Sequence, residues 1–298
     1  MALLAGLLTA APLGSAEKLR IVVVTSSAIL AYREALRGFT EAMEAGPGEL
    51  FTVDLSDGEQ QKRLPALVAG MKPRVVIAIG SQAAELLAGA PVAVIATMVL
   101  DSDRRAASGG NPLATVSLEV SLTTVLLEVK HVVPGTTRVG ILRDPARGGP
   151  SQAELGAQAK RQGFTPEFAN SNGPQHLLDS FVSLSNRVDL VWCPPDSSLF
   201  NPTTVQPLVM ASLRHRLPII GFSESFVRAG AAVGVYPDFQ DIGAQTAALT
   251  QRYLASQPAA PRETPRTVKV AVNQRIMRLF GLSYSQSAVA DGRILVIR

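Results

Sequence analysis

Cysteine is almost absent from this sequence. Among 298 residues there is one, Cys193, so the chain cannot form an internal disulfide. Cys193 ends the apolar run 188–193, and no base lies close to it in the sequence. We interpret it as a buried thiol in a strand rather than as a catalytic nucleophile, which would need an activating base.

Histidine is also scarce. His131, His176 and His215 lie far apart in segments with a helical pattern, which is typical of solvated helix faces. The motifs HExxH, CxxC and GxxxxGK[ST] do not occur. The segment 221–225 begins like the nucleophile elbow of a hydrolase, but Ser225 replaces its last glycine and no histidine follows. We therefore predict no enzymatic activity, no cofactor and no metal site.

Positive charge is not concentrated in any part of the chain. The net charge is +4, and the arginines that dominate it are scattered. Aromatic residues make up only 5% of the sequence, and no basic stripe is interleaved with them. A nucleic-acid-binding surface would need such a stripe, so we predict no nucleic-acid partner.

Long apolar runs are missing as well. Residues 1–16 are apolar but too short to span a bilayer stably. They end in Gly14, Ser15 and Ala16, small residues typical of a signal-peptidase site. We interpret 1–16 as a signal peptide and predict a periplasmic protein. Because no Lys or Arg precedes the apolar core, a frayed N-terminal helix is the alternative.

Short runs rich in Val, Ile and Ala are present throughout the rest of the chain, and hydrophobic residues reach 47%. The runs are continuous rather than alternating, which is typical of parallel strands buried on both faces. Segments with a helical pattern separate them. In the first half we predict strands over 20–25, 50–55, 75–79 and 92–98, with helices over 29–45, 60–70 and 81–87.

Turn residues interrupt this alternation over 101–115, and a second series follows. A Pro-rich stretch, 258–265, precedes the last strand, and the tail, 274–298, has the pattern of a helix and an extended end. The fold class is therefore α/β, with two doubly wound, Rossmann-like lobes and mainly parallel sheets. We predict strands over 137–142, 167–169, 188–193, 218–222, 231–236 and 267–272, and helices over 122–132, 151–162, 175–183, 203–215 and 241–254.

Four stretches carry a resemblance to a known family. They are 75–84, 133–142, 188–197 and 217–231, the last followed by Tyr236 and 241–243. Together they make the chain from 19 to 298 resemble the ABC-transporter substrate-binding proteins of the type I periplasmic-binding fold, in the subfamily that includes tryptophan- and tyrosine-binding-like proteins. The loops at 25–28, 99–102 and 111–115 depart from the pattern of that family.

The resemblance implies two lobes joined by hinge crossovers. We expect an N-terminal lobe over 19–116 plus 237–264 and a C-terminal lobe over 117–236 plus 265–298. Such a protein captures a small molecule, here an amino acid or a related compound, and delivers it to an ABC permease in the inner membrane. We expect a monomer. The alternative is a ligand-sensing or partner-binding module of the same fold.

Ligands of open α/β sheets bind at the carboxyl ends of the strands, where short polar side chains fix their orientation. Thr25 and Asp144 lie at such strand ends. The candidate ligand-binding residues are Ser26, Ser27, Ser81, Gln82 and Asp101 in the first half and Asp196, Ser197, Ser223, Glu224 and Tyr236 in the second.

Structural roles compete with ligand contact at most of these positions. Ser81 and Asp196 are also suited to capping a helix or loop, and Ser26 and Ser27 to forming a turn. Glu224 has Arg228 four residues ahead as an ion-pair partner. Tyr236 is also suited to packing at the hinge. Trp192 is expected in the core of its strand.

Overall fold

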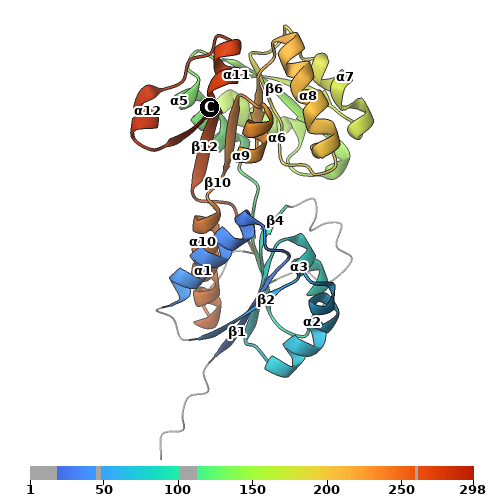
Figure 1. Ribbon diagram of the computed structural model, residues 1–298, viewed down its shortest axis with the longest axis vertical. Coiled ribbons are helices and arrows are strands. Elements are labelled where there is room, and N and C mark those ends of the chain that lie inside the picture. Colours follow the sequence, from blue (N-terminus) through green and yellow to red (C-terminus); the bar gives the residue numbers. More distant parts are fainter. Residues whose placement is uncertain (1–18, 45–47, 101–112, 259–260) are drawn as a thin grey trace, which may run out of the picture.

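The computed structural model describes residues 19–44, 48–100, 113–258 and 261–298, and it has two lobes, one above the other (Figure 1). The signal peptide predicted over 1–16 and the candidate Asp101 lie outside these described residues. Each lobe has its own sheet with helices on both faces. The predicted α/β fold with two doubly wound lobes is therefore confirmed.

The sheet of the N-terminal lobe is parallel and has the order β11-β5-β4-β3-β1-β2. Successive side chains of a strand point to opposite faces. Ile21 and Val23 therefore pack with α1 (Leu30–Met43) and α10 (Phe239–Leu254), whereas Val22 and Val24 pack with α2 (Gly58–Met71) and α3 (Ser81–Leu86). The strands are β1 (Arg20–Thr25), β2 (Glu49–Asp54), β3 (Val75–Ile79), β4 (Val94–Val99), β5 (Ala114–Ser117) and β11 (Arg262–Glu263).

Two glycines let α1 and α10 touch through their backbones. A Cβ on Gly243 of α10 would lie 2.0 Å from the carbonyl oxygen of Ala35, and one on Gly38 of α1 would lie 1.9 Å from that of Gln240. No real side chain fits at these distances, so only glycine permits this approach. The contact attaches α10, which follows the C-terminal lobe in the sequence, to the N-terminal lobe (Figure 1).

The sheet of the C-terminal lobe has the order β13-β12-β10-β9-β8-β6-β7 and is parallel except for the β10–β12 pair. Helices α5 (Leu122–Val132), α6 (Gln152–Arg161), α11 (Gln274–Leu279) and α12 (Gln286–Ala290) cover one face. Helices α7 (Leu177–Val182), α8 (Pro202–His215) and α9 (Glu224–Ala229) cover the other. The strands are β6 (Arg138–Arg143), β7 (Thr165–Asn170), β8 (Leu190–Trp192), β9 (Ile219–Gly221), β10 (Val233–Pro237), β12 (Val268–Asn273) and β13 (Ile294–Ile297).

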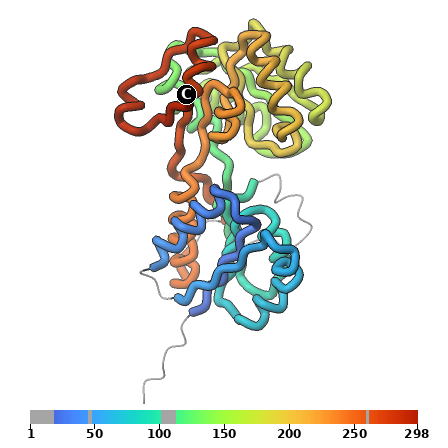
Figure 2. Tube along the Cα trace, viewed as in Figure 1, coloured from blue at the N-terminus to red at the C-terminus, as the bar shows by residue number. Residues whose placement is uncertain are grey.

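The chain passes between the lobes after β5, after β10 and after β11, and these segments form the narrow connection visible in Figure 2. Ion pairs join the segments to one another. Nη2 of Arg262 lies 3.2 Å from Oε2 of Glu119, and Nζ of Lys269 lies 3.2 Å from Oδ1 of Asp238. Asp238 also accepts a hydrogen bond from the backbone N–H of Gln240 and so caps the start of α10. The hinge is therefore a set of linked crossovers.

Two short strands differ from the sequence expectation. β5 starts at Ala114, inside the segment predicted as a loop, and β11 lies inside the Pro-rich stretch. The two pair in parallel, Arg262 with Thr115 and Glu263 with Val116, at the edge of the N-terminal sheet. Strands of two to four residues have too little sequence to show a period, so pairing with neighbours determines them.

The only cysteine and the only tryptophan of the chain are buried in the C-terminal lobe. Cys193 directly follows β8 and is fully buried, as predicted, and burial raises the pKa of its thiol. Trp192 ends β8 and is 6% exposed. None of the described helices is both long and apolar enough to cross a membrane.

Candidate ligand-binding site

Each sheet has a point at which the strand order reverses, and ligands of such sheets bind in the crevice outside the strand ends there. In the N-terminal lobe the order reverses between β1 and β3, because β2 and β3 lie on opposite sides of β1. In the C-terminal lobe it reverses between β6 and β8. The loops that follow these four strands are therefore the places to look for a site.

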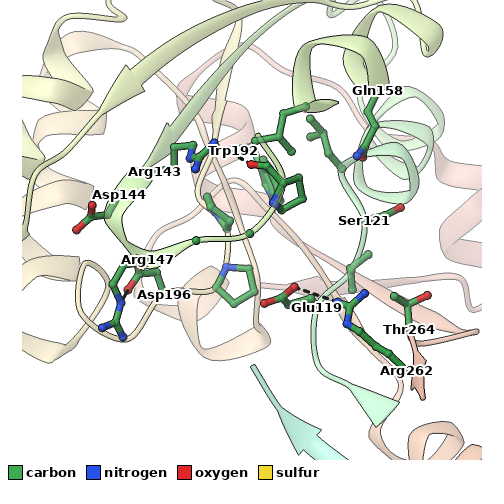
Figure 3. Close-up of a pocket in the computed structure, with 18 residues that line it drawn as sticks. Glu119, Ser121, Arg143, Asp144, Arg147, Gln158, Trp192, Asp196, Arg262 and Thr264 are labelled. Carbon is green, nitrogen blue, oxygen red and sulfur yellow. Dashed lines mark hydrogen bonds and ion pairs between the residues drawn. The ribbon is translucent and has the colours of Figure 1, made fainter. Parts of the chain in front are cut away.

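A cavity of about 280 Å³ opens at the reversal point of the C-terminal lobe. It is enclosed by the loops after β6 and β8, by the start of α5 and part of α6, and by the crossovers after β5 and β11 (Figure 3). Its volume is close to the lower end of the range for small-molecule sites. The lining residues are Glu119, Val120, Ser121, Leu122, Arg143, Asp144, Arg147, Gly148, Gly149, Pro150, Leu155, Gln158, Trp192, Pro194, Pro195, Asp196, Arg262 and Thr264.

One part of the cavity is apolar. Trp192 lines it together with Leu155 and Leu122, and all three also belong to the hydrophobic core of the lobe. The sequence predicted Trp192 as core, and its burial confirms this, but the indole also borders the cavity (Figure 3). Pro194 and Pro195 continue the apolar lining beyond the strand. An apolar portion of a ligand would be stabilised here, because contact with this lining removes apolar surface from water.

The charged side chains of the cavity are mostly engaged. Nε of Arg147 lies 3.8 Å from Oδ1 of Asp196, and Glu119 pairs with Arg262. Asp144 accepts a hydrogen bond at 2.9 Å from the backbone N–H of Ala146, and it caps the 3₁₀ turn Pro145–Arg147. The electrostatics of the cavity therefore depend on pairs that join its separate segments.

Asp196, a ligand-binding candidate from the sequence, lines the cavity and is 8% exposed. Its Oδ1 accepts hydrogen bonds from the backbone N–H and the hydroxyl of Ser198, at 2.9 and 2.6 Å, and from the N–H of Leu199 at 3.3 Å. These bonds make Asp196 the cap of the loop after β8. Ser197, beside it, is exposed and does not line this cavity.

The candidates of the N-terminal lobe lie at its own reversal point, after β1 and β3, and do not line the cavity. Ser26 is buried: its hydroxyl donates to the carbonyl oxygen of Ile79 and accepts from the N–H of Ala83, each at 2.9 Å. Ser27 and Ser81 are half-buried, and Gln82 is exposed. The hydroxyl of Ser26 thus joins β3 to the first turn of α3.

Tyr32 also lies at this reversal point, and sequence reasoning missed it. A Cβ on Gly80 would lie 2.7 Å from Cζ and from Oη of Tyr32 and 2.6 Å from Oγ of Ser26. Gly80 has a φ of 93°, a value that favours glycine. The tyrosine ring therefore lies directly over the Gly80 backbone, in the first turns of α1.

The remaining candidates lie where β9 and β10 end. Ser223 accepts a hydrogen bond from the N–H of Phe226 and caps α9. Glu224 pairs with Arg228, the local alternative that the sequence suggested. Tyr236 is 4% exposed, and its ring centroid is 6.4 Å from that of Phe239. Burial, followed by the charge and hydrogen bond of Glu224, raises the pKa of Tyr236 to about 12.

Comparison with known protein families identifies the family to which this chain belongs. A sequence model described as "ABC transporter substrate binding protein" matches residues 31–291. This chain belongs to that family. The match confirms the resemblance found in the sequence and supports a solute-binding role for the substrate-binding protein described here.

Solved structures share the fold of this substrate-binding protein. An ABC domain from Streptococcus pneumoniae in complex with L-Trp is 18% identical, with a TM-score of 0.62 over 94% of this chain and 100% of the other. The ligand-free, open form of a substrate-binding protein with adhesive properties from Clostridium difficile is 16% identical, with a TM-score of 0.67 over 94% and 99%. At these identities the likeness establishes the fold alone. No curated protein sequence matches significantly.

A third similar structure is a mutant XylFII–LytSN complex, at 15% identity and a TM-score of 0.60 over 85% of this chain and 97% of the other.

In the part of the substrate-binding protein that the structure describes, no cluster of three or more His, Cys, Asp or Glu side chains is suited to holding a metal ion.

Several cavity residues of the substrate-binding protein were missed from the sequence. Arg143 is the last residue of β6 and directly precedes Asp144, so the strand-end rule could have found it had it been applied to basic side chains. Glu119 and Arg262 had no such signal, because they belong to crossovers beside the unpredicted β5 and β11. Ser121 and Gln158 come from the start of α5 and from α6, which the rule does not cover.

Proposed function

We propose that this substrate-binding protein captures a small solute, an amino acid or a related compound, between its lobes and delivers it to an ABC permease in the inner membrane. The main support for this proposal is the cavity at the reversal point of the C-terminal lobe, which is bordered by crossovers that join the lobes. A solute bound there touches the segments that must bend when the lobes move. Its binding can therefore bias the equilibrium between open and closed forms.

In this proposal the lobes comprise 19–116 plus 237–264 and 117–236 plus 265–298. The N-terminal lobe presents Ser27, Ser81 and Gln82 from its own reversal point. On closure these side chains complete the site from the side opposite Asp196. The permease then recognises the closed form. Export by a signal peptide over 1–16, a periplasmic location and a monomeric state belong to the same proposal.

Trp192 provides a direct test, because it is the only tryptophan of the chain and lines the cavity. We would titrate the ligand-stripped protein with amino acids, nucleosides and small organic acids, and record both tryptophan fluorescence and binding heat. The proposal expects a stoichiometric ligand that changes the fluorescence. The variant Trp192→Phe is the control: the heat of binding persists in it while the fluorescence change disappears.

Absence of binding across the panel, by a protein that circular dichroism shows to be folded, would contradict solute capture. The alternative would then be a partner-binding module. This alternative is consistent with the XylFII–LytSN complex, in which a protein of similar fold is bound to a second protein. If a ligand is found, uptake of that solute by cells with and without the gene distinguishes transport from sensing.

A further inference from the structure

The charges that line the cavity are formally balanced but not equally available. Arg143, Arg147 and Arg262 face Glu119, Asp144 and Asp196. Two ion pairs, Arg147–Asp196 and Arg262–Glu119, account for four of these six groups. The remaining two, Arg143 and Asp144, are neighbours in the sequence, and their side chains leave the end of β6 in different directions (Figure 3).

Arg143 is directed into the cavity. It lines the cavity together with Trp192 (Figure 3), and its Nη1 donates a hydrogen bond at 2.9 Å to the carbonyl oxygen of Pro150. Among the described residues, no carboxylate forms an ion pair with it. A guanidinium has five N–H donors in a planar fork, so one bond to a carbonyl leaves most of them available to an anion.

The two aspartates are less suited to a ligand. Asp144 points away from Arg143 in Figure 3 and caps a 3₁₀ turn. Asp196 accepts its hydrogen bonds from Ser198 and Leu199, and Arg147 lies beside it. Both carboxylates therefore hold the cavity loops in place. The charge that the cavity offers to a solute is positive.

We propose that the solute carries an anionic group, such as a carboxylate, that Arg143 binds, and an apolar portion that packs against Trp192. This inference rests on the proposed solute-binding function and narrows its substrate class to small organic anions. The guanidinium and the indole line the same small cavity, so one small solute can reach both of them. A positive group on the solute is not needed for binding.

The test uses solutes in matched sets that share one apolar body. One set is 3-phenylpropionate, its neutral amide, phenethylamine and L-phenylalanine, and further sets pair other carboxylates from the panel with their amides. Binding is followed by the fluorescence of Trp192 and by calorimetry. We expect each carboxylate that binds to do so more tightly than its amide, and amines without an anionic group not to bind.

The variant Arg143→Gln should weaken binding of the anion by about 10- to 100-fold, which is the usual effect of removing a charged hydrogen-bond partner. Arg143→Lys should weaken it less, because it keeps the charge but not the fork. Arg214→Gln makes the same charge change at an exposed position of α8 outside the cavity and should leave affinity unchanged. Thermal unfolding verifies that each variant is folded.

A solute that binds as tightly in its neutral form as in its anionic form would overturn the inference and leave the proposed function standing. The same holds if Arg143→Gln leaves the affinity for an anion unchanged. If Arg143→Gln does not fold, the matched solutes and Arg143→Lys still decide the question. Failure of the folded protein to bind any solute would overturn both proposals.

Discussion

The two lobes have the same doubly wound plan, but the loops at their reversal points carry different side chains. In the N-terminal lobe these are short hydroxyls, and that of Ser26 is engaged by the backbone of its own lobe. In the C-terminal lobe they are charged, arginines and aspartates, and the indole of Trp192 lines the same cavity. The same position in the fold therefore serves mainly to join strand and helix in one lobe and to line a cavity in the other.

This difference teaches that a strand-end location marks where a ligand can bind but not whether a side chain is available to it. Ser26 has both of its hydrogen-bonding functions satisfied. Arg143, at the corresponding edge of the other sheet, has one hydrogen bond and no carboxylate partner among the described residues. The predictions below test this contrast by changing one lobe at a time.

The largest effect on the free energy of unfolding is expected at the contact between α1 and α10 in the N-terminal lobe. Gly243→Ala would place a Cβ 2.0 Å from the carbonyl oxygen of Ala35, and neither backbone can move without separating α1 from α10. We expect the free energy of unfolding to fall by about 3 kcal/mol. Chemical denaturation followed by circular dichroism measures it.

Gly70→Ala in α2 is the matched control, because nothing lies within 4 Å of the added Cβ. It should raise the free energy of unfolding by about 0.5 to 1 kcal/mol, since alanine favours the helix. The fluorescence of Trp192 reports in addition whether the C-terminal lobe unfolds together with the N-terminal one. Equal stability of Gly243→Ala and the wild type would show that α1 and α10 are not in backbone contact.

The second prediction separates loop capping from ligand contact at Asp196. Asp196→Ala removes the acceptor of three hydrogen bonds and the partner of Arg147, so we expect a loss of about 2 kcal/mol in the free energy of unfolding. Asp196→Asn keeps a side-chain oxygen at this position and should retain most of the stability. Denaturant titration of both variants measures the difference.

Solute titration of the same two variants completes the test. If Asp196 is mainly a loop cap, Asp196→Asn should bind an anionic solute at least as well as the wild type does, because Arg147 loses its competing carboxylate. An affinity that falls more than tenfold in the asparagine variant, with stability preserved, would instead identify Asp196 as a direct ligand of the solute.

The third prediction concerns Ser26. Ser26→Ala leaves the carbonyl oxygen of Ile79 and the N–H of Ala83 without their side-chain partner, so the free energy of unfolding should fall by about 1 kcal/mol. Ser27→Ala, at the neighbouring half-buried position, is the control and should have little effect on stability. Stability that is unchanged in Ser26→Ala, with a loss of solute affinity, would contradict the structural role.

The fold was largely predictable because its strands are continuous runs of Val, Ile and Ala, as at 20–25 and 75–79, which parallel sheets require. The strands β5 and β11 were not, since they are short and depend on pairing, β5 with β4 and β11 with β5 across a long sequence separation. This omission carried over to the site. Glu119 and Arg262 reach the cavity only because those strands place their crossovers side by side.

Of the residues that line the cavity, Asp144 and Asp196 could be named from the sequence because carboxylates at strand ends stand out. Sequence reasoning did not find Arg143, whose importance depends on which charges pair with one another in space. Arg147 is paired with Asp196, and Arg143 has no carboxylate partner among the described residues, yet both are arginines close to the same strand end. The order of residues in the sequence does not say which arginine pairs with Asp196, whereas the positions of the side chains do.

The smallest effect is expected at Tyr236, between the two lobes. Burial and the nearby Glu224 carboxylate raise the pKa of Tyr236 from its ordinary value of 10.0 to about 12, so the folded protein favours the neutral phenol. The resulting stabilisation is fully present below pH 10 and is lost as the pH rises from 10 to about 12. Tyr236→Phe keeps the ring beside Phe239 but cannot ionise.

At neutral pH the loss of the hydroxyl should therefore change the free energy of unfolding by less than about 1 kcal/mol. Between pH 10 and about 12 the wild type should lose more stability than Tyr236→Phe does. Urea unfolding at neutral pH and between pH 10 and about 12 measures the free energy of unfolding of both proteins, with Tyr253→Phe on α10 as the matched control. If the wild type and Tyr236→Phe lose the same stability in alkali, the phenol is not held between the lobes in a buried, neutral form, because an exposed tyrosine would ionise equally in the folded and unfolded chains.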